Sequence, residues 1–124
     1  MPPINPTAFA TAWAAAWNAR DLDSVLAHFA DDVVFSTPKA LDVVGRPTVR
    51  GKAAVRAYWE AALARIAHLR FEVIRTTWDP AAAELAIIYD REINQGRDRA
   101  LELLRFGPLG LVVSGEVFYG VIPG

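Results

Sequence analysis

The spacing of apolar residues changes from a helical to a strand period near the middle of the chain. In the first half, Phe9, Trp13 and Trp17 recur every four residues, which places their side chains on one face of a helix. Asn5 followed by Pro6 is a typical helix start, because asparagine caps well and proline suits the first helical position. We therefore expect a first helix over residues 6–19.

Two more helices are predicted before the pattern changes. Asp21 or Asp23 opens a short one, whose apolar face carries Leu22, Val25, Leu26 and Phe29. Residues 33–37 read as a short strand that Pro38 ends, and residues 39–50 as a loop. The third helix is expected to run from about residue 51 to residue 67.

The second half alternates apolar and polar residues and is expected to form four strands, at about residues 69–78, 84–94, 98–107 and 111–121. Their connections are short, so consecutive strands should pair as an antiparallel meander. Helices followed by strands predict an α+β fold, with a curved sheet that the helices cover on one face. The length of 124 residues fits a single domain over residues 1–124.

The connection at Gln95-Gly96 predicts the strand register. As a two-residue turn it sets Asn94 opposite Arg97, and Glu92 opposite Arg99 as an ion pair on one face. The other face is the more apolar one, so we expect it to be the concave face under the helices. It carries Leu85, Ile87, Tyr89, Arg91, Ala100, Glu102, Leu104 and Phe106, and from the last strand Leu111, Val113, Gly115, Val117 and Tyr119.

Glu102 is the exceptional residue of this inner face, since it lies among leucine, valine and phenylalanine side chains and faces Gly115 in this register. Burial disfavours a charged carboxylate, so the pKa of Glu102 should be raised, as in a group that transfers protons. Two other readings stay open. Glu102 forms a structural pair with Tyr89 or Arg91, or a register shifted by one residue turns it to solvent.

The outer face of the same strands is also partly apolar. Ile88, Leu101 and Leu103 are adjacent on it. Contiguous apolar patches usually mark an interface, so we expect a homodimer formed through the outer sheet face.

Composition excludes several classes of function. The net charge is −1, with 13 basic and 14 acidic residues interspersed, which argues against a nucleic-acid or membrane-surface role. Because cysteine is absent, disulfides and thiolate metal sites are excluded. His28 and His68 lack partners at a metal-like spacing, and no glycine-rich phosphate loop is present, so neither metal nor cofactor is expected. Without a signal peptide or membrane-length apolar run, a cytoplasmic location is expected.

Two segments carry a family resemblance: the run from Trp13 to Phe35, WAAAWNARDLDSVLAHFADDVVF, and the run from Val49 to Arg56, VRGKAAVR. The chain resembles the nuclear transport factor 2-like superfamily, and within it the SnoaL-like and ketosteroid-isomerase-like branch. The resemblance implies a cone-shaped fold: three N-terminal helices on a curved antiparallel sheet with a mixed edge, around a central pocket. It also implies frequent dimerisation through the outer sheet face.

The resemblance to ketosteroid isomerase can be carried over residue by residue. Its aspartate base corresponds to Thr37, its oxyanion-hole tyrosine to Trp13 and its protonated aspartate to Glu102. Threonine cannot serve as that base, and an indole N–H only donates. Steroid isomerisation by that mechanism is therefore not expected, and only Glu102 keeps the chemistry of its position.

The leading hypothesis is a protein that binds a small hydrophobic molecule in the central pocket. As an enzyme it would perform cofactor-free acid–base chemistry, such as isomerisation, cyclisation, dehydration or hydrolysis. Glu102 would transfer the proton, with Tyr89 and Tyr119 as its hydroxyl partners. The alternatives are a non-catalytic binding module and a dimerisation domain. Lys39, Asp42 and Arg46 either form a lid at the pocket mouth or are solvated charges. The expected ligand contacts are Trp13, Trp17, Phe35, Thr37, Tyr58, Trp59, Arg91, Leu104, Val117 and Tyr119.

Overall fold

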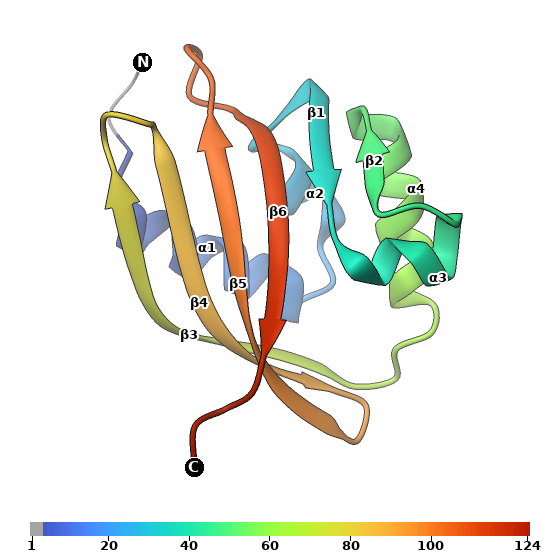
Figure 1. The fold of residues 1–124 in the computed structure, drawn as a ribbon. Coiled ribbons are helices and arrows are strands. Elements are labelled where there is room, and N and C mark those ends of the chain that lie inside the picture. Colours follow the sequence, from blue (N-terminus) through green and yellow to red (C-terminus); the bar gives the residue numbers. More distant parts are fainter. Residues whose placement is uncertain (1–3) are drawn as a thin grey trace.

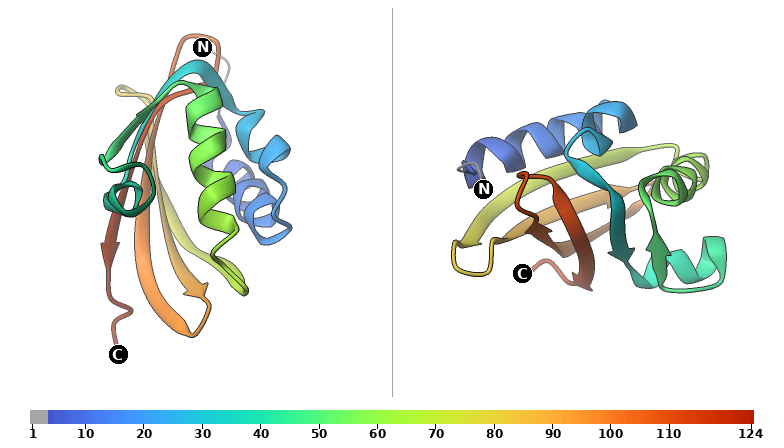
Figure 2. Two further views of the ribbon diagram at one scale, coloured as in Figure 1. Left: turned by 90° about the vertical axis from the view of Figure 1, so that its right-hand side faces the viewer. Right: turned by 90° about the horizontal axis from the view of Figure 1, so that it is seen from above.

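The computed structural model describes residues 4–124 and confirms the α+β fold. A six-stranded curved sheet has the order β2-β1-β6-β5-β4-β3, and its neighbours are antiparallel except for the parallel pair β1 and β6, which gives the sheet its mixed edge. Helices α1, α2 and α4 lie on one face of the sheet, and the short helix α3 lies at its β2 edge (Figures 1 and 2). The elements are α1 (Pro6–Asn18), α2 (Leu22–Leu26), β1 (Phe29–Ser36), the 3-10 helix η1 (Pro38–Ala40), α3 (Leu41–Val44), β2 (Thr48–Arg50), α4 (Lys52–Leu63), β3 (Leu69–Asp79), β4 (Glu84–Ile93), β5 (Gly96–Phe106) and β6 (Val112–Gly120).

The first two helices begin where the capping residues predicted. Asn5 Oδ1 accepts a hydrogen bond from the Ala8 amide at 2.9 Å, and Asp21 Oδ1 accepts one from the Ser24 amide at 3.1 Å. Asp21, and not Asp23, is therefore the cap of α2. Trp13 and Trp17 are both buried, because α1 packs its aromatic stripe toward the sheet.

Helix α4 ends at Leu63, four residues before its predicted end. The Arg20 guanidinium donates to the carbonyl oxygens of Leu63 at 3.3 Å and Ile66 at 2.8 Å. Asn94 Oδ1 accepts from the Ala67 amide at 2.7 Å. These partners come from distant parts of the chain and satisfy the backbone groups of the final turn and the following linker, which a helical period alone does not reveal.

The region between the second and third predicted helices contains more structure than expected. Strand β1 begins at Phe29, which was assigned to the preceding helix, and Phe29 pairs with Val112 of β6 in the core. The predicted loop over residues 39–50 contains most of η1, all of α3 and strand β2. The Thr37 hydroxyl caps η1 by accepting from the Lys39 amide at 3.3 Å.

The register of β4 and β5 differs from the prediction by two residues. Ile93 pairs with Gly96, so the turn is Asn94-Gln95, and Asn94 has a φ of 56°, a left-handed conformation that asparagine tolerates. An even shift keeps each side chain on its predicted face, so the inner face of both strands was predicted correctly. The prediction of an ion pair between Glu92 and Arg99 was wrong, because Arg99 Nε donates to Asp90 Oδ1 at 2.7 Å.

Strands β5 and β6 show a similar shift and an irregularity. Glu102 pairs with Val117 instead of Gly115. A bulge between Arg105 and Phe106 changes the alternation on β6, so that Val112 is fully buried while Val113 is only half-buried. The inward placement of Val113 was therefore wrong, because a bulge reverses the side of the following residues.

Gly115 allows β1 to approach β6 closely. It pairs with Phe35, and a Cβ atom at this position would lie 2.9 Å from Phe35 Cδ1 and 3.3 Å from Leu104 Cδ2. The space that Gly115 leaves is therefore filled by the Phe35 ring and is not open beside Glu102.

The outer face of the sheet has no helix over it among the described residues (Figure 2). Across its centre, Ile88 pairs with Leu101, and Leu101 pairs with Phe118. Phe118 is 48% exposed and Ile74, on β3, is 39% exposed. Within residues 4–124, no helix has the length and apolar character that crossing a membrane requires.

Candidate functional site

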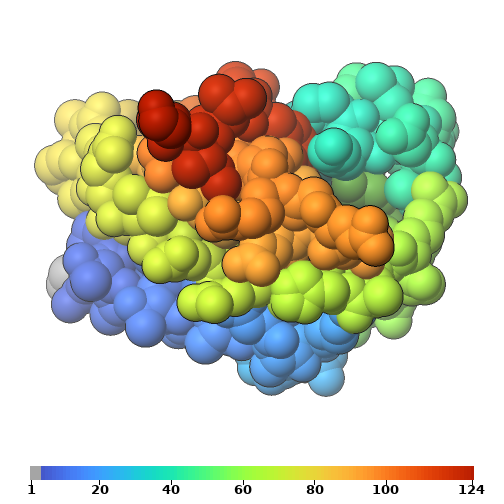
Figure 3. All heavy atoms as spheres, turned by 90° about the horizontal axis from the view of Figure 1, so that it is seen from below, coloured from blue at the N-terminus to red at the C-terminus, as the bar shows by residue number. Residues whose placement is uncertain are grey.

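A cavity of about 250 Å³ lies between the helices and the concave face of the sheet. Its mouth lies on the underside of the molecule, where the α3 segment, the end of α4 and the β4–β5 hairpin come together (Figure 3). Eleven of the predicted site residues line this cavity: Trp13, Trp17, Phe35, Thr37, Tyr58, Trp59, Tyr89, Arg91, Glu102, Val117 and Tyr119.

Leu104 is the predicted ligand contact that does not line the cavity. Its side chain is on the inner face, as expected, but it is fully buried and packs beside Gly115 and Phe35. Because the Phe35 ring covers the gap left by Gly115, Leu104 belongs to the hydrophobic core. Its assignment as a ligand contact was wrong.

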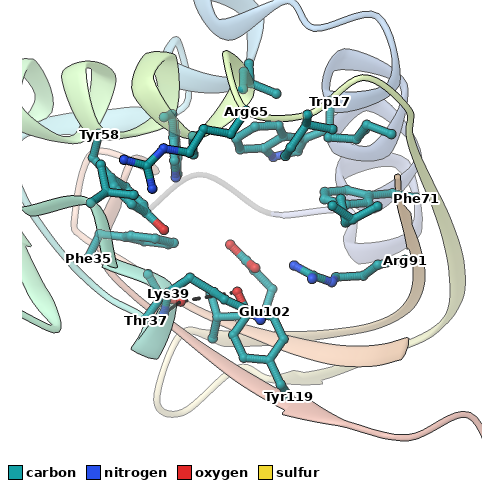
Figure 4. Close-up of a pocket in the computed structure, with 18 of the residues that line it drawn as sticks. Trp17, Phe35, Thr37, Lys39, Tyr58, Arg65, Phe71, Arg91, Glu102 and Tyr119 are labelled. Atoms are coloured by element: carbon teal, nitrogen blue, oxygen red, sulfur yellow. Dashed lines mark hydrogen bonds between the residues drawn. The ribbon is translucent and has the colours of Figure 1, made fainter. Parts of the chain in front are cut away.

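Glu102 is the only acidic residue among the described residues that is buried, with 4% of its surface exposed. Strand β5 holds it on the concave face, and its carboxyl group points into the cavity, toward the same space as the Arg91 guanidinium (Figure 4). The Tyr89 hydroxyl donates a hydrogen bond to Glu102 Oε1 at 2.9 Å. The two residues are two positions out of register on neighbouring strands, so this bond runs diagonally across the sheet.

Burial raises the pKa of Glu102 from its ordinary value of 4.5 to about 7. The hydrogen bond from Tyr89 and the positive charge of Arg91 both lower this pKa, but they offset only part of the cost of removing the carboxylate from water. Near neutral pH the group therefore exists in both protonation states. A carboxyl group with this property can donate a proton or accept one.

The tyrosines of the cavity remain protonated hydroxyl groups. Burial, followed by the nearby negative charge of Glu102, raises the pKa of Tyr89 well above its ordinary value. Burial also raises the pKa of Tyr58 and that of Tyr119. Tyr119 and Thr37 share a hydrogen bond of 3.2 Å between their hydroxyl oxygens.

Arg91 is fixed at the edge of the cavity by an acidic neighbour. Its Nε–H donates to Asp98 Oδ1 at 2.8 Å, and its guanidinium carbon lies 4.6 Å from the centre of the Tyr119 ring. Burial alone would lower the pKa of Arg91, but the hydrogen bond to Asp98 acts in the opposite direction and the net pKa is raised. Lys39 Nζ also lies over the Tyr119 ring, 4.9 Å from its centre.

Aromatic rings form the wall opposite the polar groups. The Trp17 and Trp59 rings meet edge to face at 4.9 Å, as do the Trp13 and Tyr89 rings. Phe71 stacks on Trp13 at 5.6 Å. Such flat, rigid walls favour a flat ligand.

The indole N–H groups of Trp13 and Trp17 are buried without a hydrogen-bond partner in residues 4–124. Both residues are more than nine-tenths buried and both line the cavity. A buried donor without a partner costs free energy, and these nitrogens have almost no accessible surface, so in the cavity wall the two indoles act as apolar rings.

Sequence reasoning missed several residues at the cavity. Phe71 was unassigned, although the β3–β4 hairpin pairs it with Arg91 and could have placed it on the inner face. Lys39 and Asp42 line the mouth, whereas Arg46, grouped with them in the sequence, does not. The others were not considered for the site and come from α3, the end of α4, the linker after it, and strands β3 and β4: Val43, Ala62, Leu63, Arg65, Ile66, Leu69 and Ile93.

Ionisable and hydroxyl groups line the cavity together with apolar side chains. No three histidine, aspartate or glutamate side chains within residues 4–124 come close enough together to hold a metal ion. The positions that correspond to the isomerase base and tyrosine, Thr37 and Trp13, do line the cavity with Glu102. The arrangement therefore offers one buried acid, Glu102, several hydroxyl groups and the Arg91 guanidinium around an apolar space.

Comparisons with known proteins support the same fold. The family model of the SnoaL-like domain matches residues 10–105. A SnoaL-like protein of unknown function from Burkholderia thailandensis is 37% identical, with 96% of this chain and 99% of that chain covered and a TM-score of 0.83. An NTF2-like protein of unknown function from Burkholderia pseudomallei is 20% identical, with 94% and 92% covered and a TM-score of 0.79.

A third solved structure shows the fold alone. It is a protein of unknown function with a cystatin-like fold from Methylobium petroleophilum, 20% identical, with 99% of this chain and 82% of that chain covered and a TM-score of 0.76. Taken together, these likenesses confirm the cone-shaped architecture that the sequence resemblance implied.

The raised pKa of Glu102 predicts how stability depends on pH. The folded protein binds this proton more tightly than the unfolded chain, so the resulting stability is complete below pH 4.5 and is lost as the pH rises through about 7. Glu102→Gln removes this titration and should gain about 3 kcal/mol relative to the wild type between pH 4 and pH 9. Urea unfolding of both proteins across this range measures the difference. A constant difference would contradict the prediction.

Proposed function

The chain belongs to the SnoaL-like domain family of the nuclear transport factor 2-like superfamily, and we propose that its central cavity binds a small hydrophobic molecule and transfers a proton to or from it. The observation that carries this proposal is the carboxyl group of Glu102, buried in the cavity wall beside open apolar space. Keeping an acid there costs stability at neutral pH, which a purely structural hydrophobic residue would avoid.

In the proposed reaction Glu102 is the proton-transfer group. When ionised it can remove a proton from a carbon or oxygen of the ligand, and when protonated it can return one, as isomerisation, cyclisation, dehydration or hydrolysis requires. Tyr89 donates to Glu102 Oε1 and so fixes that oxygen, which leaves the other oxygen for the ligand. Tyr58 and Tyr119 can donate to a developing oxyanion, because both remain neutral hydroxyl groups.

The second candidate is a binding protein without catalysis. The bond between Tyr89 and Glu102 favours it, because a hydrogen-bonded pair also satisfies a buried acid. The two candidates share the cavity and differ in what Glu102 does. Glu102→Gln preserves shape and hydrogen bonding, so it should retain binding in both cases and abolish turnover only in the first.

Filling the cavity should prevent binding. Ala62, on α4, lines the cavity, and Ala62→Phe would place a ring in it. In thermal-shift screens of aromatic polyketides, terpenoids and steroids, hydrophobic compounds should raise the melting temperature of the wild type but not of Ala62→Phe.

The control is Ala61→Phe, one position earlier on α4, where the side chain is exposed. This variant adds the same ring outside the cavity and should respond as the wild type does. A flat response of the wild type to all three compound classes would contradict small-molecule binding.

We also propose that two copies associate through the outer face of the sheet. The row of Ile88, Leu101 and Phe118 supports this, since Phe118 is 48% exposed at its end; Leu103 lies beside the row and is half-buried. Such a patch can contribute the apolar centre of an interface.

Light scattering should give twice the chain mass for the wild type and a monomer for Phe118→Glu. Leu109→Glu, at an 81% exposed position in the β5–β6 loop, should remain dimeric. A wild type that stays monomeric at high concentration would rule out this interface.

A further inference from the structure

The charged groups around the cavity are unbalanced. Its lining includes three basic residues, Lys39, Arg65 and Arg91, but only two acids, Asp42 and Glu102. Glu102 is deeply buried and accepts a hydrogen bond from Tyr89. Asp42 is the only acid of the lining that is exposed, at the rim. Asp98 lies outside the lining and pairs with Arg91, so the rim, with Lys39, Arg65 and Asp42, keeps an excess of one positive charge, although the whole chain has a net charge of −1.

Arg91 is positioned to use its charge inside the cavity. Only its Nε–H is occupied, by Asp98, and its two terminal NH2 groups have no hydrogen-bond partner in residues 4–124. The side chain is 13% exposed, so a ligand group at these nitrogens would be largely shielded from water. A guanidinium with its terminal nitrogens free can bind a carboxylate-like group.

A second cation lies at the same corner. Lys39 Nζ and the Arg91 guanidinium are both within 5 Å of the Tyr119 ring centre, at 4.9 and 4.6 Å. Lys39 forms no ion pair among the described residues. Lys39 therefore adds a second positive charge beside the Tyr119 ring.

The remaining polar groups of the cavity are also mainly donors. Tyr58 and Tyr119 line the cavity and supply neutral hydroxyl groups. A ligand that satisfies them must carry oxygen acceptors on an apolar body. The volume of about 250 Å³ lies near the lower limit for ligand sites, which favours a molecule of about two rings.

From these contacts we infer that the ligand is a small, flat, hydrophobic molecule with an anionic oxygen group, a carboxylate, phenolate or enolate, which Arg91 binds at the Lys39–Tyr119 corner. This inference specifies the ligand class of the proposed function and rests on it. With the anion at Arg91 and its rings against the aromatic wall, the molecule would occupy the space into which the Glu102 carboxyl group points (Figure 4). Proton transfer would then occur at an atom near the anionic group.

Naphthalene-2-carboxylate and its neutral amide, naphthalene-2-carboxamide, test the inference, because they share their shape and differ in charge. Calorimetric titration at slightly acidic pH should show about 10- to 100-fold tighter binding of the carboxylate, the range expected when a hydrogen bond gains a charged partner. Arg91→Gln should remove this preference, while Arg91→Lys should keep part of it.

Strands β4 and β5 provide a matched control. Arg99 pairs with Asp90 on the outer face, as Arg91 pairs with Asp98 on the inner face. Arg99→Gln therefore breaks an equivalent ion pair without changing the cavity and should keep the full preference. The melting temperature of each variant shows that it is folded.

The outcomes separate the inference from the proposed function. Equal binding of both probes, blocked by Ala62→Phe, would overturn the anion inference and leave hydrophobic binding intact. A preference that survives in Arg91→Gln would overturn the role of Arg91. If neither probe binds the wild type, both the inferred ligand class and the proposed binding of two-ring hydrophobic molecules are contradicted.

Discussion

The site depends on the burial of one carboxyl group in an apolar sheet face. Glu102 is held where water is largely excluded, and the Tyr89 hydroxyl and the Arg91 charge only partly replace the lost solvation. The result is a neutral or half-ionised acid at the wall of a cavity. An apolar residue of similar size would have removed this desolvation cost. The proposed proton transfer gives a reason for an acid at this position.

The rest of the fold keeps the space beside this group open. Helices α1 and α4 supply large, rigid aromatic rings that pack edge to face, Trp17 on Trp59 between the helices and Trp13 on Tyr89 of the sheet. On the opposite side, Gly115 lets Phe35 and β1 close against β6, which completes the wall. Arg91 and Lys39 then give the cavity a charged corner around Tyr119.

The sequence was sufficient to predict the inner face because side-chain alternation survives an even register shift. Tyr89 and Glu102 stayed on the same face although the turn moved from Gln95-Gly96 to Asn94-Gln95. Gly96 suggested a turn at Gln95-Gly96, because glycine is common in the second position of such turns. In the structure the turn is Asn94-Gln95, and Asn94 adopts the left-handed conformation. On β6 the alternation failed at Val113, since a bulge is a local irregularity with no clear pattern in the flanking residues.

Features that depend on distant contacts could not be predicted in this way. The end of α4 is set by Arg20 and Asn94, which no local pattern connects to it. The sequence did not reveal that Lys39 and Arg91 both lie over the Tyr119 ring, because the three residues come from three separate elements. Arg65 became part of the mouth because the helix ends before it.

The central claim is that Glu102 is a desolvated acid that titrates near neutrality. Carbon-detected NMR of the labelled protein measures it directly, with the Glu102 carboxyl signal assigned by its loss in Glu102→Gln. The expected midpoint is about 7, and Tyr89→Phe should raise it further because it removes a hydrogen bond that lowers the pKa. A midpoint near 4.5, unchanged in Tyr89→Phe, would contradict the account.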